Sequence, residues 1–284
     1  MTIIIRIIVF AIMLSITNIY AQDFQGIATY KTKRKVDIKL DSTSMHSDMQ
    51  KQMTEMLKKR FQKTFKLSFN KEASVYKEDE SLAPPQVGSS SMEIRIVGAG
   101  GGSDILYKNT KKSTFIDQKD VMGKIFLVKD NLKPLEWKLE SESKYIGEYK
   151  CYKATFTREI EVVSRTSFNG ASKVKDEAST KQKKTQTVTA WYTPQIPINN
   201  GPANYYGLPG LILEINTGEQ QIVCSRIVLN PKDKIEIKEP TKGKEIDKAE
   251  YDKIMEKKRK EMLERFAPRN GRDGGETIQI KIGG

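Results

Sequence analysis

Histidine is nearly absent from this chain, because His46 is the only one among its 284 residues. A serine or cysteine hydrolase of the usual kind needs a histidine base beside its nucleophile, and a catalytic zinc site needs three protein ligands. The 36 Asp and Glu residues leave a carboxylate pair open, although no spacing singles one out. We therefore predict no catalytic residue and no cofactor, and we interpret the protein as a non-enzyme.

Cysteine is also scarce, since Cys151 and Cys224 are the only two and neither lies near the N-terminus, where a lipid-carrying cysteine would stand. Both fall in segments of alternating polarity, 148–158 and 220–229, which are typical of strands. In an oxidising compartment such a pair favours one disulfide. If the two strands are neighbours, the bridge would close a loop of roughly 70 residues and stabilise the fold by about 4 kcal/mol. Two buried free thiols are the alternative.

An almost unbroken apolar run lies at the N-terminus. Arg6 precedes the apolar residues 7–16, and a small residue, Ala21, stands before Gln22. A basic start, an apolar middle and a small final residue form the pattern of a secretory signal, and a membrane anchor of about 20 residues is the alternative. We predict a signal peptide at 1–21, a single β-rich domain at 22–284, and a periplasmic or secreted protein.

Positive charge exceeds negative charge, with a formal net charge of +13. Such an excess raises the question of nucleic acid or anionic lipid as a partner. The lysines, however, are spread along the chain, and the stretch 232–269 combines its basic residues with many acidic ones. Mixed charges are typical of a solvated surface, so we predict no nucleic-acid binding and keep an anionic membrane surface as the weaker alternative.

Short segments rich in β-branched and aromatic residues recur along the chain, separated by turn residues. They lie at 27–36, 64–69, 73–77, 92–97, 105–108, 113–117, 124–129, 135–140, 149–158, 185–192, 211–216, 221–229 and 277–282. Polar and apolar residues alternate in 149–156 and 187–192, so one face of each strand is buried and the other is solvated. We predict a mainly β fold of the α+β class, built on one curved antiparallel sheet.

Two segments have the spacing of helices instead. In 45–61 the apolar residues form a single stripe, which consists of Met45, Met49, Met53, Met56, Leu57 and Phe61. We predict that this helix covers the apolar face of the sheet. A second helix, 247–266, begins with a capping box of Asp247 and Glu250 and ends before Pro268. It belongs to a C-terminal helical extension at about 244–270.

We favour packing on the sheet as the role of the methionine stripe. Two other interpretations stay open. Thioethers and one imidazole are soft ligands that suit Cu(I), so Met45, His46 and Met49 are weak candidates for a metal site. Methionine side chains also form adaptable binding surfaces. The candidates for ligand binding are Met49, Met53, Met56, Trp191, Tyr205 and Tyr206.

The most distinctive segment is Gly207-Leu208-Pro209-Gly210-Leu211-Ile212. Pro209 followed by Gly210 suits the two central positions of a type II turn, because proline fixes φ and glycine accepts a positive φ. The apolar residues that follow predict a deeply buried strand. Nothing in the segment supplies a nucleophile, so a structural corner is favoured over a catalytic loop.

This hexapeptide resembles the one that names the GLPGLI family of exported bacterial proteins. Residues 190–194, 201–202, 151–154 and 69–76 also resemble that family. The resemblance covers most of the mature chain and implies a β-rich protein of the Gram-negative envelope, in a family without an established biochemical role. By analogy of fold, it implies a half-barrel like that of periplasmic lipoprotein carriers, in which a helix covers a curled sheet.

These observations lead to a non-catalytic binding or accessory protein of the envelope, which holds an apolar ligand or a partner segment on the concave face of the sheet. The ligand could be an acyl chain, a peptide or a strand of a partner protein. A structural subunit beside an outer-membrane transporter is the alternative. A metal-binding protein or a carboxylate enzyme, using His46, is the third interpretation, and the sequence leaves the oligomeric state open.

Overall fold

The computed structural model describes residues 24–39, 62–79, 104–164, 180–265 and 279–282. The elements are β1 (Gln25–Arg34), β2 (Val36–Lys39), β3 (Lys63–Asn70), β4 (Ala73–Glu78), β5 (Ile105–Asn109), β6 (Thr114–Val121), β7 (Lys124–Asn131), β8 (Lys138–Ile146), β9 (Tyr149–Ser164), β10 (Thr180–Thr193), β11 (Leu211–Asn216), β12 (Gln220–Leu229), β13 (Lys244–Ile246), α3 (Lys248–Arg265) and β14 (Gln279–Ile282). No helix in these ranges is long and apolar enough to cross a membrane. The predicted covering helix at 45–61 lies outside the described residues.

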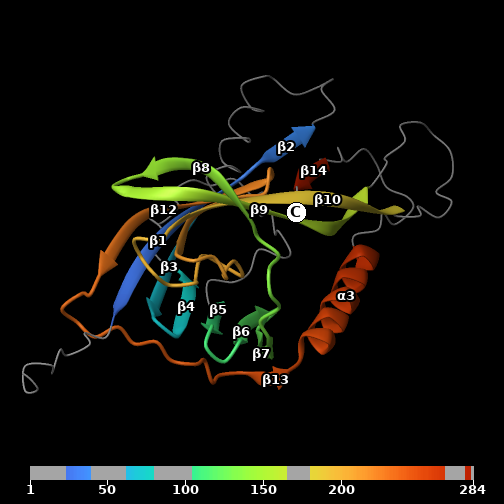
Figure 1. Ribbon diagram of the computed structural model, residues 1–284. Helices are drawn as coiled ribbons and strands as arrows, with labels where there is room; N and C mark the ends of the chain where they lie inside the picture. The colour runs from blue at the N-terminus through green and yellow to red at the C-terminus, as the bar shows by residue number, and fades with distance from the viewer. Residues whose placement is uncertain (1–23, 40–61, 80–103, 165–179, 266–278, 283–284) are drawn as a thin grey trace, which may run out of the picture.

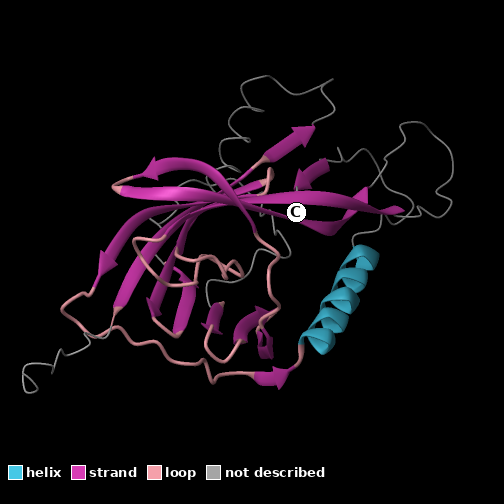
Figure 2. Ribbon diagram, viewed as in Figure 1, coloured by secondary structure: helices cyan, strands magenta, loops and turns pink. Residues whose placement is uncertain are grey.

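Twelve strands form one open, curved sheet in the order β13-β7-β6-β5-β4-β3-β1-β12-β11-β10-β9-β8 (Figure 1). Neighbouring strands are antiparallel, except that β13 runs parallel to β7. β14 and β2 form a separate two-stranded sheet. Figure 2 shows α3 as the one helix of the described part of the chain. The prediction of a mainly β fold with a curved antiparallel sheet is confirmed.

The first strand joins the two halves of the sheet. The strands β3 to β7 and the strands β8 to β12 each form a meander, in which strands that follow one another in sequence are neighbours. β1 lies between them and pairs with β3 on one side and with β12 on the other. Its burial alternates along the strand, so that Gly26, Ala28, Tyr30 and Thr32 are buried. Alternation of this kind turns one side of each strand toward the core.

The concave face of the sheet is lined by rows of residues that lie opposite one another on successive strands. One row crosses seven strands and consists of Ala28, Leu67, Tyr76, Leu106, Asp117, Val128 and Ile246. The row beside it consists of Phe69, Ser74, Lys108 and Phe115. The first row is apolar except for Asp117 and the hydroxyl of Tyr76, and the second row places Ser74 and Lys108 between two phenylalanines.

The C-terminal helix matches its prediction closely. α3 spans Lys248–Arg265, against a predicted 247–266. The Asp247 side chain caps it, because its Oδ1 accepts a hydrogen bond of 2.7 Å from the amide of Glu250. Tyr251 and Ile254 from its first turns pack against Phe126 and Val128 of the sheet. The Asp247 cap therefore marks the start of the helix near β7, while the Glu250 carboxylate pairs with Lys244 instead of closing the capping box.

The turn between β6 and β7 yields a first prediction about stability. Met122 and Gly123 both have positive φ, 54° and 82°, as in a type I′ turn, and 66% of the Met122 surface is exposed. Because asparagine accepts this conformation better than methionine, Met122→Asn is expected to raise the free energy of unfolding by about 1 kcal/mol. Urea denaturation measures the change. Met122→Ala retains the unfavourable φ and should leave stability nearly unchanged, whereas an equal gain in both variants would contradict this reason.

Candidate functional site

The connection between β10 and β11, residues 194–210, lies on the concave side of the sheet (Figure 1). Its apolar side chains Ile196, Ile198 and Leu208 are buried in the main hydrophobic core together with residues of the sheet. We call residues 194–210 the motif loop, because they contain the first four residues of the hexapeptide 207–212. In the described part of the chain, apolar residues on the concave face of the sheet are therefore covered by a segment of the chain itself.

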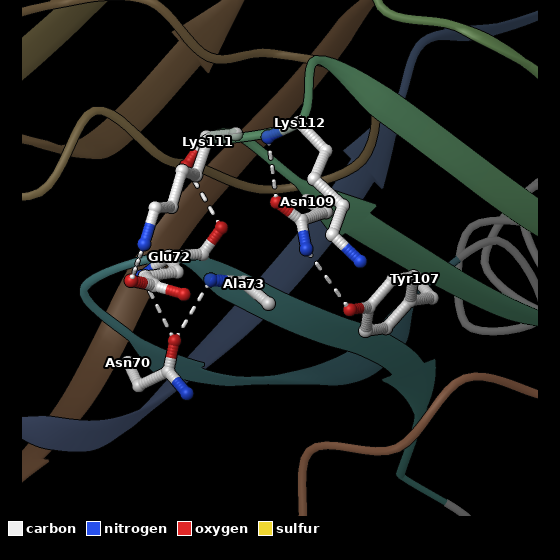
Figure 3. Close-up of polar contacts among 8 residues, drawn as sticks. Asn70, Glu72, Ala73, Tyr107, Asn109, Lys111 and Lys112 are labelled. Carbon is white, nitrogen blue, oxygen red and sulfur yellow. Dashed lines mark hydrogen bonds and ion pairs between the residues drawn. The ribbon is translucent and has the colours of Figure 1, made fainter.

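Two hairpin turns fix the strands beneath the motif loop (Figure 3). In the turn between β3 and β4, Asn70 Oδ1 accepts a hydrogen bond of 2.9 Å from the amide of Glu72. In the turn between β5 and β6, Asn109 Oδ1 accepts one of 2.8 Å from the amide of Lys112. The Lys111 ammonium joins the two turns, since its Nζ lies 2.5 Å from Glu72 Oε1. The asparagine bonds shape each turn locally, and the exposed ion pair links the two turns at the end where β4 and β5 pair.

Lys108 of β5 is the most unusual side chain of the concave face, because it is fully buried. Its Nζ donates hydrogen bonds to three carbonyl oxygens of the motif loop, at 2.8 Å to Gly201, 2.7 Å to Ala203 and 3.4 Å to Tyr205. Among the described residues no carboxylate forms an ion pair with it. Burial therefore lowers the pKa of Lys108 from 10.5 to about 7.

A lysine with a lowered pKa can act as a nucleophile or a base, but only where a substrate reaches its nitrogen. The nitrogen of Lys108 is enclosed by carbonyl oxygens of the loop above it. Its three contacts fall on alternate residues of the motif loop, so one side chain binds three carbonyl groups within a stretch of five residues. The geometry makes Lys108 an anchor of the motif loop.

Two further hydrogen bonds hold the motif loop and the start of β11, the strand that follows it. Asn200 Nδ2 donates to Ser74 Oγ at 2.9 Å, beside Lys108 in the same row. The Tyr30 hydroxyl donates to the carbonyl oxygen of Ile212 at 2.7 Å. Each bond joins a buried group to a partner far away in sequence, and each would leave an unsatisfied buried group if it were broken.

Two of the three glycines of the motif loop, Gly201 and Gly210, lie where a side chain has no room. A Cβ atom on Gly210 would lie 2.2 Å from the carbonyl oxygen of Thr193, and one on Gly201 would lie 2.7 Å from Ile212 Cβ. The predicted type II turn is wrong, because Gly210 has a φ of 154° and its amide donates to the carbonyl of Leu208 at 2.8 Å. A hydrogen bond between residues two apart is typical of a γ-turn, here centred on Pro209. The close approach to Thr193, rather than a turn type, requires the glycine.

The connection between β7 and β8 packs on the outer side of the motif loop. Trp137 Nε1 donates to the carbonyl oxygen of Tyr206 at 2.8 Å, and the Tyr206 hydroxyl donates to the carbonyl of Lys133. The Trp137 ring also meets the Phe156 ring edge-on, with 4.6 Å between centroids. The motif loop is thus held between the sheet on one side and residues 132–137 on the other.

The three aromatic residues that the sequence suggested as ligand contacts, Trp191, Tyr205 and Tyr206, each contact other parts of the chain. Tyr205 is buried in the main core, and Tyr206 is half-buried beside Trp137. Trp191 carries the Lys144 ammonium over its ring, with Nζ 4.4 Å from the centroid. The structure therefore engages all three in contacts within the chain. The other candidates, Met45, His46, Met49, Met53 and Met56, lie outside the described residues.

The Lys144 side chain reaches from the edge strand β8 to β11. Its Nζ lies 2.5 Å from Glu214 Oε2, and Gln221 donates to Glu214 Oε1 at 3.0 Å. β9 and β10 lie between these two strands in the sheet. Because the Glu214 carboxylate is mostly buried, this ion pair fastens the edge strand to the centre of its half of the sheet.

The predicted disulfide is not present, since Cys151 and Cys224 are both free and buried. The prediction required neighbouring strands, but β10 and β11 separate β9 from β12. Burial raises the pKa of Cys151 to about 11 and that of Cys224 to about 12. Both thiols therefore stay protonated at neutral pH, and the alternative of two buried free thiols describes them.

No group of three or more His, Cys, Asp and Glu side chains that could hold a metal ion occurs among the described residues. Sequence patterns did not single out Lys108 or Asp117 either, although both are polar residues at inward-facing positions of apolar strands. The alternation of side chains along a strand could have revealed them, because residues two apart lie on the same side. Lys108 shares its side of β5 with Leu106, and Asp117 shares its side of β6 with Phe115.

Comparison with known proteins gives two findings and one absence. A family model described as "Protein of unknown function (Porph_ging)" matches residues 137–214, a range that includes the hexapeptide. Two solved structures of PNGF-II, in space groups C2 and P21, are similar to the chain with 15% sequence identity and a TM-score of 0.47. Each similarity covers 83% of this chain but only 33% and 34% of those chains, so this chain spans about a third of their length. None of the curated proteins compared matches the chain.

Proposed function

We propose that this chain is a non-catalytic accessory protein of the bacterial envelope that acts by contact with a partner protein. One observation carries the proposal, namely that the motif loop already occupies the concave face on which a carrier would hold an apolar ligand. Ile196, Ile198 and Leu208 of the loop fill that face with buried apolar area. An acyl chain would have to displace them, and each buried side chain contributes about 1.5–3 kcal/mol to keeping the loop in place.

The reactive groups of the core support a non-catalytic role. The Lys108 ammonium donates its hydrogen bonds to carbonyl oxygens of the motif loop. Cys151 and Cys224 are buried thiols whose pKa values are raised by burial, which makes them poor nucleophiles. The partner that we propose is an outer-membrane transporter or another envelope protein, and a lipid or peptide carrier remains the competing function.

Native mass spectrometry distinguishes the accessory protein from the carrier. The protein purified from envelopes is expected to have the mass of its polypeptide alone, and extraction with organic solvent should not change the melting temperature after refolding. Mild cross-linking in intact envelopes should recover one partner protein in a fixed ratio. Copurifying lipid, together with a loss of stability on extraction, would contradict the proposal and favour the carrier.

A further inference from the structure

Asp117 of β6 is a carboxylate in an otherwise apolar row of the concave face. Leu106 lies opposite it on β5 and Val128 lies opposite it on β7, and both are buried. The Asp117 side chain itself is 16% exposed. A carboxylate in this position loses most of its hydration, so the ionised form is costly unless a cation compensates for it.

The compensation that Asp117 receives is incomplete. Its Oδ1 is buried, and Lys119 Nζ, the close cation among the described residues, lies 3.4 Å away. Lys119 also lies 3.1 Å from Asp104 Oδ2, so two carboxylates share one ammonium. Asp104 Oδ1 in turn accepts a hydrogen bond from the amide of Asp120. Asp104 is thus held in place as a competitor for the cation.

The first turns of α3 lie next to this carboxylate. Tyr251 and Ile254 pack with Phe126, Val128 and Ile246, and the last two belong to the same row as Asp117. Figure 1 shows the helix standing beside β7 and β13. The ionisable groups that face Asp117 are Lys119 of its own strand, Asp104 before β5, and Lys248 of α3, while Tyr251 of α3 faces the same cluster.

We propose that Asp117 is a pH-sensitive latch for α3, and that the helix docks more tightly on the sheet when this carboxyl is protonated than when it is ionised. Burial raises the pKa of Asp117 from 3.8 to about 6, against the opposing attraction of Lys119 and Lys248. Release of α3 would admit water to the carboxyl and return its pKa toward the ordinary value. Docking and protonation therefore favour each other, and the effect grows as pH falls from about 6 toward 4.

Hydrogen exchange of the α3 amides, corrected for the intrinsic dependence of exchange on pH, tests the latch in the full chain. Protection of residues 251–258 is expected to be about tenfold higher at about pH 5 than at about pH 7.5, since one pKa unit corresponds to a tenfold change in equilibrium. Asp117→Asn has nearly the same shape and no charge. It should show the high protection at both pH values.

Two further variants make the test specific. Asp104→Asn leaves Lys119 to Asp117 alone, so the midpoint of the protection change should move to lower pH. Asp120→Asn removes a carboxylate near the end of β6, whose Oδ1 accepts a hydrogen bond from the amide of Gly123, and should leave the midpoint where it is. A wild-type helix with no change in protection between the two pH values, or an unaltered change in Asp117→Asn, would overturn the latch.

Discussion

Gly210→Ala is expected to lower the free energy of unfolding by about 3–5 kcal/mol, because its methyl group would have the shortest contact found for any described glycine. The added Cβ would lie 2.2 Å from the carbonyl oxygen and 2.5 Å from the carbonyl carbon of Thr193. Both atoms belong to the backbone at the end of β10, which cannot rotate away as a side chain would. A φ of 154° adds backbone strain to the overlap.

Gly218→Ala is the matched control for this prediction. Gly218 also has a positive φ, 81°, but no atom lies within 4 Å of the position of its Cβ. The control therefore measures the strain of a positive φ alone, about 1 kcal/mol. Urea denaturation of both variants separates the two contributions. Equal losses of stability would mean that the approach of Gly210 to Thr193 is relieved by movement of the motif loop.

Local patterns were enough to predict the strands and the C-terminal helix. Alternating polarity in 187–192 predicted β10, where Val188 and Ala190 are buried and Thr187 is exposed. The capping box at Asp247 and Glu250 predicted the start of α3 to within one residue. These features depend on residues close together in sequence, which fix which side of an element meets the core.

Long-range pairing was beyond the reach of those patterns. β1 lies between β3 and β12, and no local feature of Gln25–Arg34 specifies a partner some 190 residues away. The disulfide prediction failed for the same reason, because it depended on which strands are neighbours. The pattern predicted an apolar concave face, and among the described residues the motif loop covers it. The predicted cover at 45–61 lies outside those residues and stays a prediction.

Lys108→Met is expected to lower the free energy of unfolding by about 3 kcal/mol at neutral pH. Methionine retains an unbranched apolar stem of similar length, but it donates no hydrogen bond. The carbonyl oxygens of Gly201, Ala203 and Tyr205 would then lose the donor that Lys108 supplies. Unsatisfied buried acceptors cost about 1–3 kcal/mol each, and relief from burying the ammonium offsets part of that sum.

The loss caused by Lys108→Met should also grow with pH. In the folded protein Lys108 loses its proton near pH 7, whereas in the unfolded chain it keeps the proton up to its ordinary value of 10.5. The unfolded state therefore binds more protons between these values, and the wild type gains roughly 1 kcal/mol of stability per pH unit from this residue. Methionine lacks that gain, so the difference in stability between the two proteins should be larger at about pH 9 than at about pH 7.

Lys112→Met tests whether the effect belongs to the motif loop. Lys112 lies in the turn after β5, is exposed, and contributes its amide rather than its ammonium to the hydrogen bond with Asn109. Its replacement should change stability by less than about 0.5 kcal/mol at either pH. Hydrogen exchange in residues 196–212 should rise in Lys108→Met alone, because the anchor of these residues is removed. A stable Lys108→Met protein with unchanged exchange there would show that buried apolar contacts hold the motif loop without the lysine.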